Sequence, residues 1–187
     1  MIPHLAKTIL RALLFILPCA TVHAAPSNEN KVKAVFIHNV AKYVEWPPAI
    51  PVNGALRLCI LGQPPFTEAA NLLCGKQIGG RVWEVWHVDY SACLDECRVL
   101  FIAASESGNL RHVLEKIKGN TTLTVGDTNG YAAQGVMVNF YYQESNYVRF
   151  EINVGAVRRA GLNIDSQLLR LAYIVKESTA TQTGAAQ

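Results

Sequence analysis

The chain has 187 residues, of which 50% are hydrophobic, and a formal net charge of +3 at neutral pH. This length is sufficient for one domain with a substantial apolar core. A charge so close to zero, without a run of basic residues, argues against binding to nucleic acid or to an anionic membrane surface.

The N-terminus has the features of an export signal. Lys7 and Arg11 are followed by an apolar stretch over residues 12–22 and by a small residue, Ala24, at the expected cleavage point. This order predicts a cleaved signal peptide over residues 1–24. The stretch is short for the alternative, a retained membrane anchor, which needs about 20 apolar residues. Cleavage would leave 15 basic and 14 acidic residues, a net charge of +1.

Four cysteines follow the signal: Cys59, Cys74, Cys93 and Cys97. An even number in an exported protein favours two disulfides over free thiols. A metal site is disfavoured because the ligand spacing that zinc sites use is missing. Four cysteines allow three pairings, and the sequence leaves all of them open. If the early strands are neighbours in the sheet, Cys59 starts close to Cys97, and the preferred scheme is Cys59–Cys97 with Cys74–Cys93.

Helices and strands alternate in the first two thirds of the domain. Apolar residues at three- and four-residue spacing predict a helix over residues 32–46, which Pro47 and Pro48 end. The next predicted elements are, in chain order, a strand over residues 56–61, a helix over 66–73, strands over 82–88 and 99–103, a helix over 107–118 and a strand over 122–125.

The last third predicts a hairpin and two helices. Residues 136–142 and 147–152 form the expected antiparallel pair, joined by a turn over residues 143–146. Asn153 is a candidate cap for a short helix, and Asp165 or Ser166 for the last one. The predicted fold is therefore a single α/β domain over residues 31–176, with a mixed β-sheet flanked by helices. A flexible tail is expected over residues 177–187.

The sequence carries no motif that requires catalysis. It contains no phosphate-binding loop, no dinucleotide fingerprint and no hydrolase nucleophile elbow. His38, His87 and His112 lie in separate predicted elements without acidic residues at ligand spacing. The sequence therefore predicts a binding protein rather than an enzyme, with no metal and no cofactor.

Polar residues within apolar segments are the candidate binding residues. Asn39 lies in a predicted helix, Asn139 in a predicted strand and Asn153 at the end of one, and all three have apolar neighbours in the sequence. One interpretation is that these amides satisfy backbone groups. The other is that they line a recognition groove together with Trp46, Arg81 and Arg149.

Two further tryptophans lie in one predicted strand. The odd spacing of Trp83 and Trp86 places them on opposite faces of that strand, so one of them is expected to be exposed. Exposed tryptophan favours protein interfaces.

Six segments, taken in order, resemble the YfiR-like family of periplasmic regulators. They are KAVFIHNVAKYVEWP (33–47), LRLCILG (56–62), CRVLFI (97–102), LTVGD (123–127), GVMVNF (135–140) and RFEIN (149–153). The resemblance implies a soluble, disulfide-stabilised homodimer of the periplasm. Such a protein would bind the periplasmic sensor region of an inner-membrane diguanylate cyclase, repress it, and thereby control cyclic-di-GMP signalling. It also implies a second partner, an outer-membrane peptidoglycan-associated lipoprotein that sequesters the repressor.

The cysteines match this family only in part. Cys59 and Cys97 correspond to one family disulfide, whereas Cys74 and Cys93 are additional and the second family pair has no counterpart. An alternative function is a periplasmic small-molecule sensor with a pocket formed by Asn39, Trp46, Arg81 and Asn139.

Overall fold

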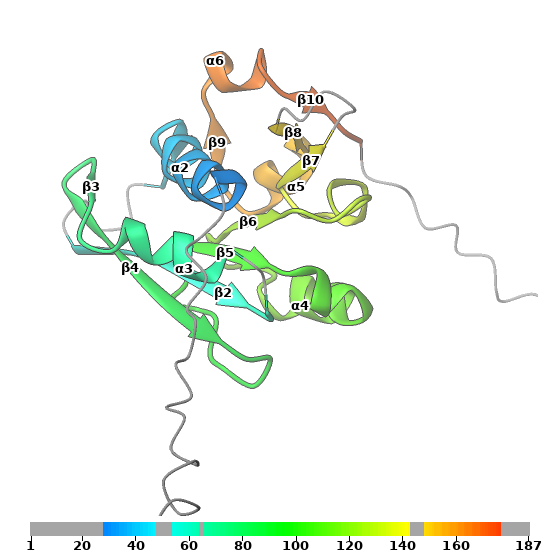
Figure 1. Cartoon of the computed structure of the whole chain (residues 1–187). Helices are drawn as coiled ribbons and strands as arrows, with labels where there is room; N and C mark the ends of the chain where they lie inside the picture. The colour runs from blue at the N-terminus through cyan, green and yellow to red at the C-terminus, as the bar shows by residue number, and fades with distance from the viewer. Residues whose placement is uncertain (1–27, 48–53, 64–65, 143–147, 177–187) are drawn as a thin grey trace, which may run out of the picture.

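The computed structural model describes residues 28–47, 54–63, 66–142 and 148–176 (Figure 1). The predicted signal peptide, C-terminal tail and hairpin turn lie outside these residues. None of the described helices is long and apolar enough to cross a membrane.

An eight-stranded mixed β-sheet runs through the centre of the domain (Figure 1). Its strands, in spatial order, are β10 (Tyr173–Ile174), β8 (Val148–Ile152), β7 (Val138–Tyr142), β6 (Leu123–Gly126), β5 (Val99–Ile102), β2 (Gly54–Leu61), β4 (Arg81–Val88) and β3 (Gln77–Ile78). The five strands from β7 to β4 are parallel, and β8 and β3 run antiparallel to their neighbours β7 and β4. A separate antiparallel pair joins β1 (Val44–Glu45) to β9 (Asn163–Ile164).

Helices cover both faces of this sheet. The helical elements are α2 (Asn28–Lys42), α3 (Thr67–Ala70), η1 (Asn71–Leu73), η2 (Ala104–Asn109), α4 (Leu110–Lys116), η3 (Ala132–Gln134), α5 (Val154–Arg159) and α6 (Ser166–Leu169). Side chains of α2 and α3 join Leu58 and Ile60 of β2 in one core cluster. Side chains of α4 join Cys59 and Leu61 in the other. Successive residues of a strand face opposite sides, so the central strands are buried on both faces, as parallel strands usually are.

The structure confirms the predicted fold class and the two predicted helix caps. The Asn153 side chain accepts a hydrogen bond from the backbone N–H of Ala156 at the start of α5. The Asp165 side chain accepts one from the backbone N–H of Gln167 at the start of α6. Each acceptor satisfies a backbone donor that a helix leaves unpaired at its N-terminus.

Two predicted helices are shorter than the sequence indicated. The first ends at Lys42, and Val44–Glu45 leave it to pair with β9. The last helix, whose apolar pattern continues to Val175 in the sequence, ends at Leu169. Tyr173–Ile174 then pair in parallel with β8, and the Val175 N–H donates to the Ile152 carbonyl. In both cases pairing with a distant strand overrides the local helical pattern.

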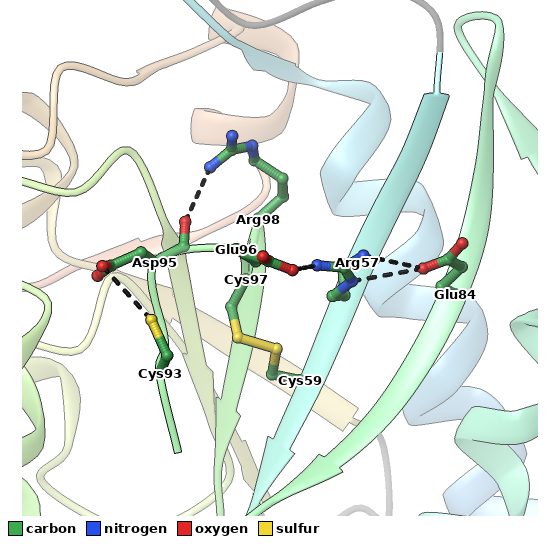
Figure 2. A network of polar contacts seen from close by, with 8 residues as sticks. All are labelled: Arg57, Cys59, Glu84, Cys93, Asp95, Glu96, Cys97 and Arg98. Carbon is green, nitrogen blue, oxygen red and sulfur yellow. Dashed lines mark hydrogen bonds and ion pairs between the residues drawn. A yellow bond between two sulfur atoms is a disulfide. The ribbon is translucent and has the colours of Figure 1, made fainter. Parts of the chain in front are cut away.

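A disulfide joins Cys59 on β2 to Cys97, which directly precedes Arg98 and β5 (Figure 2). The strands β2 and β5 are neighbours, with Leu58 opposite Val99, and the two Cα atoms are 5.6 Å apart. This is the first pair of the preferred scheme, and the reason given for it, adjacent strands, is also confirmed.

The second predicted disulfide is wrong, because Cys74 and Cys93 are exposed free thiols. Cys74 follows Leu73, which belongs to the core on the α2 face of the sheet. Cys93 precedes Leu94, which belongs to the core on the α4 face. The sheet therefore separates the two segments that carry these thiols.

Candidate protein interface

The outer face of α2 is an exposed, largely apolar stripe. Val32, Val35 and Tyr43 are 47%, 56% and 37% exposed, and Asn39 lies among them, also exposed. Spacings of three and four residues place Val32, Val35 and Asn39 on one side of the helix, and Tyr43 directly follows its last residue. We call Val32, Val35, Asn39 and Tyr43 the α2 stripe.

The opposite face of α2 is the one that packs on the sheet. It buries a set of mostly small or aliphatic residues, Asn30, Lys33, Ala34, Ile37, Val40 and Ala41. Phe36 lies at the boundary, with its ring centroid 5.3 Å from that of Phe140 and 4.6 Å from that of Phe150. Val32, Val35 and Tyr43, which belong to the apolar pattern that predicted this helix, are therefore exposed to solvent. Apolar residues on a helix usually face the core, so the outer face of α2 is a candidate binding surface.

Trp46 and Arg81 meet close to the end of the stripe. The Arg81 guanidinium carbon is 6.0 Å from the centroid of the Trp46 ring, within cation–π range. Partial burial, together with the nearby charge of Arg98, lowers the pKa of Arg81, but an arginine remains a cation at neutral pH. Only two residues separate Trp46 from Tyr43, so at most about 11 Å of chain joins them.

Lys42 and His38 flank the C-terminal half of the stripe. Lys42 donates a hydrogen bond to the Asn39 amide oxygen at 3.3 Å. The Trp83 indole N–H donates to Nδ1 of His38 at 2.8 Å, which fixes that nitrogen as an unprotonated acceptor. Burial lowers the pKa of His38, and the positive charges of Lys42 and Lys76 lower it further.

The lowered pKa of His38 predicts a pH-dependent contribution to stability. The folded pKa lies below the ordinary value of about 6.5, so below that pH the unfolded chain binds more protons. Stability is therefore lost as the pH falls from about 6.5 through the folded pKa. Thermal unfolding at pH 7.5 and 5.5 should show a larger loss for the wild type than for His38→Gln. We expect a difference of about 1 kcal/mol or less, since solvent screens this group. Equal losses in the two proteins would contradict the assignment.

The structure does not gather all six predicted binding residues into one groove. Asn139 is fully buried: its amide oxygen accepts from the Thr128 N–H and its amide nitrogen donates to Glu151, both at 3.2 Å. Asn153 is also buried, and it donates to the Ala132 carbonyl at 2.8 Å in addition to capping α5. These two amides satisfy neighbouring polar groups, which is the first of the two interpretations.

Arg149 lies far from Trp46 and Arg81 in the sheet. It belongs to β8, whereas Arg81 opens β4, and four strands separate β8 from β4. Arg149 lines a cavity of about 280 Å³ beside Leu171 and Tyr173. Of the six residues, only Asn39, Trp46 and Arg81 thus lie in one region, at the C-terminal half of α2.

The two tryptophans of β4 lie on opposite faces, as their spacing predicted. Trp83 is buried, and Trp86 is 46% exposed. The Arg57 guanidinium carbon lies 3.8 Å from the centroid of the Trp86 ring. Arg57 also forms ion pairs with Glu84 and Glu96, above the Cys59–Cys97 disulfide (Figure 2). Within this second surface, Arg57 is therefore paired with two carboxylates of the protein itself.

Comparison with solved structures shows the fold alone. A conserved domain protein from Vibrio cholerae O1 biovar El Tor matches with a TM-score of 0.60 at 11% identity. An ABC domain from Streptococcus pneumoniae, solved in complex with L-Trp, matches with a TM-score of 0.52 at 8% identity. Each match covers 79% of this chain and 60% of the other, so the chain spans well under the full length of these proteins.

Comparison with protein families is more specific. A search of curated proteins finds no match. The model of the YfiR/HmsC-like family matches residues 30–173, which include all the described helices and strands apart from the first two residues of α2 and the last residue of β10. The match agrees with the six segments that suggested this family. The chain belongs to the YfiR/HmsC-like family.

Proposed function

We propose that this protein is a non-catalytic periplasmic regulator that binds the periplasmic sensor region of an inner-membrane diguanylate cyclase and represses it. Membership of the YfiR/HmsC-like family supports this class of function. The observation in the structure that supports it best is the α2 stripe, with Val35 56% exposed at its centre. An exposed apolar helix face is a common docking surface for a partner protein.

The chemistry of the stripe also restricts the partner. Its apolar residues would form the centre of the contact, and Trp46 with Arg81 would form one edge. Lys42 and Arg81 supply positive charge, so the complementary face of the sensor region is expected to be apolar at its centre and acidic at its rim.

A protein interface fits this region better than a small-molecule pocket does. The alternative function required Asn39, Trp46, Arg81 and Asn139 to line one pocket. Asn139 is fully buried and hydrogen-bonded on the opposite side of β7 from the α2 core. We therefore assign Asn39, Trp46 and Arg81 to a protein contact.

The remaining partners follow from the family and extend the proposal. We propose a homodimer in the periplasm, and an outer-membrane peptidoglycan-associated lipoprotein that competes for the repressor. The Cys59–Cys97 disulfide suits an oxidising compartment.

Deletion and complementation in the native host test the proposal. Deleting the gene should raise the cellular concentration of cyclic-di-GMP several-fold, and the wild-type gene should restore it. Val35→Glu and Arg81→Glu should fail to restore it, because each places a negative charge on the proposed contact surface. The Val35 side chain is exposed, so Val35→Glu should change the thermal unfolding midpoint by less than about 2 °C.

Arg149→Glu is the matched control. It makes the same charge change at the other end of the sheet, and it should complement the deletion fully. If deletion leaves cyclic-di-GMP unchanged, the proposed function is wrong. If only Arg149→Glu fails to complement, the function stands and the interface lies at the β8–β10 end instead.

A further inference from the structure

A second feature of the molecule is a cavity of about 620 Å³ between α4 and α5, at the amino ends of β6 and β7. This volume lies within the range of about 300–1,000 Å³ that small-molecule sites occupy. None of the residues of the α2 stripe lines it, so the cavity is separate from the proposed protein contact.

The buried part of this cavity combines apolar walls with two hydroxyl groups. Leu114, Ile117 and Met137 supply apolar side chains. Thr122 and Thr124 are 1% and 0% exposed.

Each threonine retains one hydrogen-bonding function for a ligand. The Thr122 hydroxyl donates to the Cys97 carbonyl at 2.7 Å, so its oxygen can still accept. The Thr124 hydroxyl oxygen accepts from the Met137 N–H at 2.9 Å, so its hydrogen can still be donated. The cavity therefore offers a ligand one buried acceptor and one buried donor.

The rim of the cavity is positively charged. Arg111, Lys118 and Arg159 line it, against a single acidic residue, Glu115. Lys118 is ion-paired with Glu115 at 3.2 Å, and three cationic side chains against one carboxylate give the rim a net positive formal charge. Arg111 belongs to α4 and Arg159 to α5, which places one guanidinium on each of the two helices that flank the cavity. Guanidinium groups bind carboxylate, sulfonate and phosphate oxygens through charge-assisted hydrogen bonds.

We propose that this cavity binds a small organic anion with a compact apolar body. The anionic group binds Arg111 and Arg159 at the rim, and the apolar body lies against Leu114, Ile117 and Met137. The two threonines then select a ligand that carries a polar atom on that body.

A ligand in this cavity would also contact two residues that form hydrogen bonds with the segment Asp95–Cys97. The Thr122 hydroxyl donates a hydrogen bond to the Cys97 carbonyl, and the Asn120 side chain donates one to the Asp95 carboxylate at 2.9 Å. Asn120 and Thr122 both line the cavity.

A pair of dyes that differ only in the anionic group tests the proposal. 8-Anilinonaphthalene-1-sulfonate carries a sulfonate on an aromatic body, and N-phenyl-1-naphthylamine has the same body without the sulfonate. Fluorescence titration of the full chain should show one equivalent of the sulfonate dye bound at least about tenfold more tightly than the neutral dye. The double variant Arg111→Gln/Arg159→Gln should lose that preference, with its binding of the neutral dye unchanged.

Arg158→Gln is the control for net charge. Arg158 is an exposed neighbour of Arg159 on the same helix and does not line the cavity. This variant should bind both dyes like the wild type. The proposal is overturned if the double variant keeps the preference for the sulfonate dye, or if Arg158→Gln loses it to the same extent. It is also overturned if the wild type binds the two dyes equally well.

Discussion

Replacing both Cys59 and Cys97 with alanine is expected to lower the free energy of unfolding by about 4 kcal/mol. The disulfide closes a loop with a sequence separation of 38 residues, and the cross-link restricts the unfolded chain more than the folded one. Both cysteines are 1% exposed and belong to the core on the α4 face. The pairing of β2 with β5 brings the two cysteines together in the folded state, so the loss is expected to come mainly from the freer unfolded chain.

Thermal unfolding of the variant checks this value. For a domain of this size, the expected loss corresponds to a fall of roughly 8–16 °C in the unfolding midpoint. The double variant Cys74→Ala/Cys93→Ala is the matched control, and it should unfold within about 2 °C of the wild type because both thiols are exposed and free. Peptide mapping under non-reducing conditions should recover the Cys59–Cys97 linkage. Recovery of a Cys74–Cys93 linkage would contradict the free thiols.

The cysteines show how far sequence reasoning could be taken. The adjacency of two apolar strands predicted Cys59–Cys97 correctly, because a short buried run on either side of a crossover is expected to form neighbouring parallel strands. The second pair followed only from counting, on the assumption that every cysteine finds a partner. The face of the sheet that each connecting segment covers depends on the tertiary fold. Cys74 and Cys93 lie in segments on opposite faces, so they do not pair.

The faces of α2 illustrate a second limit. Its sequence contains two overlapping apolar patterns, and a count of apolar positions could not tell which of them packs on the sheet. The structure selects the face with Ala34, Ile37 and Ala41, where small side chains allow close approach. The α2 stripe could therefore be recognised only after the helix was placed on the sheet.

The candidate sites differ in how well the sequence alone predicted them. The aromatic and cationic pair Trp46 and Arg81 was predicted by residue type and is brought together in the fold. Asn139 and Asn153 were predicted by the same logic, but their neighbours in space supply the partners that a buried amide requires. The sequence did not predict the cavity between α4 and α5, because Arg111 and Arg159 have the pattern of ordinary solvent-exposed helix residues.

The ion pair between α2 and the carboxyl end of β6 is expected to have the second-largest effect on stability. The Lys33 ammonium lies 2.8 Å from the Asp127 carboxylate and 3.1 Å from that of Glu29. The side chains of Lys33 and Asp127 are 5% and 11% exposed, whereas that of Glu29 is 52% exposed. Lys33→Met should lower the free energy of unfolding by about 3 kcal/mol, because it leaves a nearly buried carboxylate without its cation.

Two further variants separate the charge effect from packing, and urea-induced unfolding measures all of them. Lys33→Met/Asp127→Leu should recover most of the lost stability, since two apolar side chains replace the pair and no unpaired charge remains. Glu29→Gln should cost only about 0.5 kcal/mol, because its carboxylate is half exposed and screened by solvent. If Lys33→Met costs as little as Glu29→Gln does, the ion pair does not hold α2 on the sheet. The packing of Ile37 and Ala41 would then account for the position of the helix, and with it for the orientation of the α2 stripe.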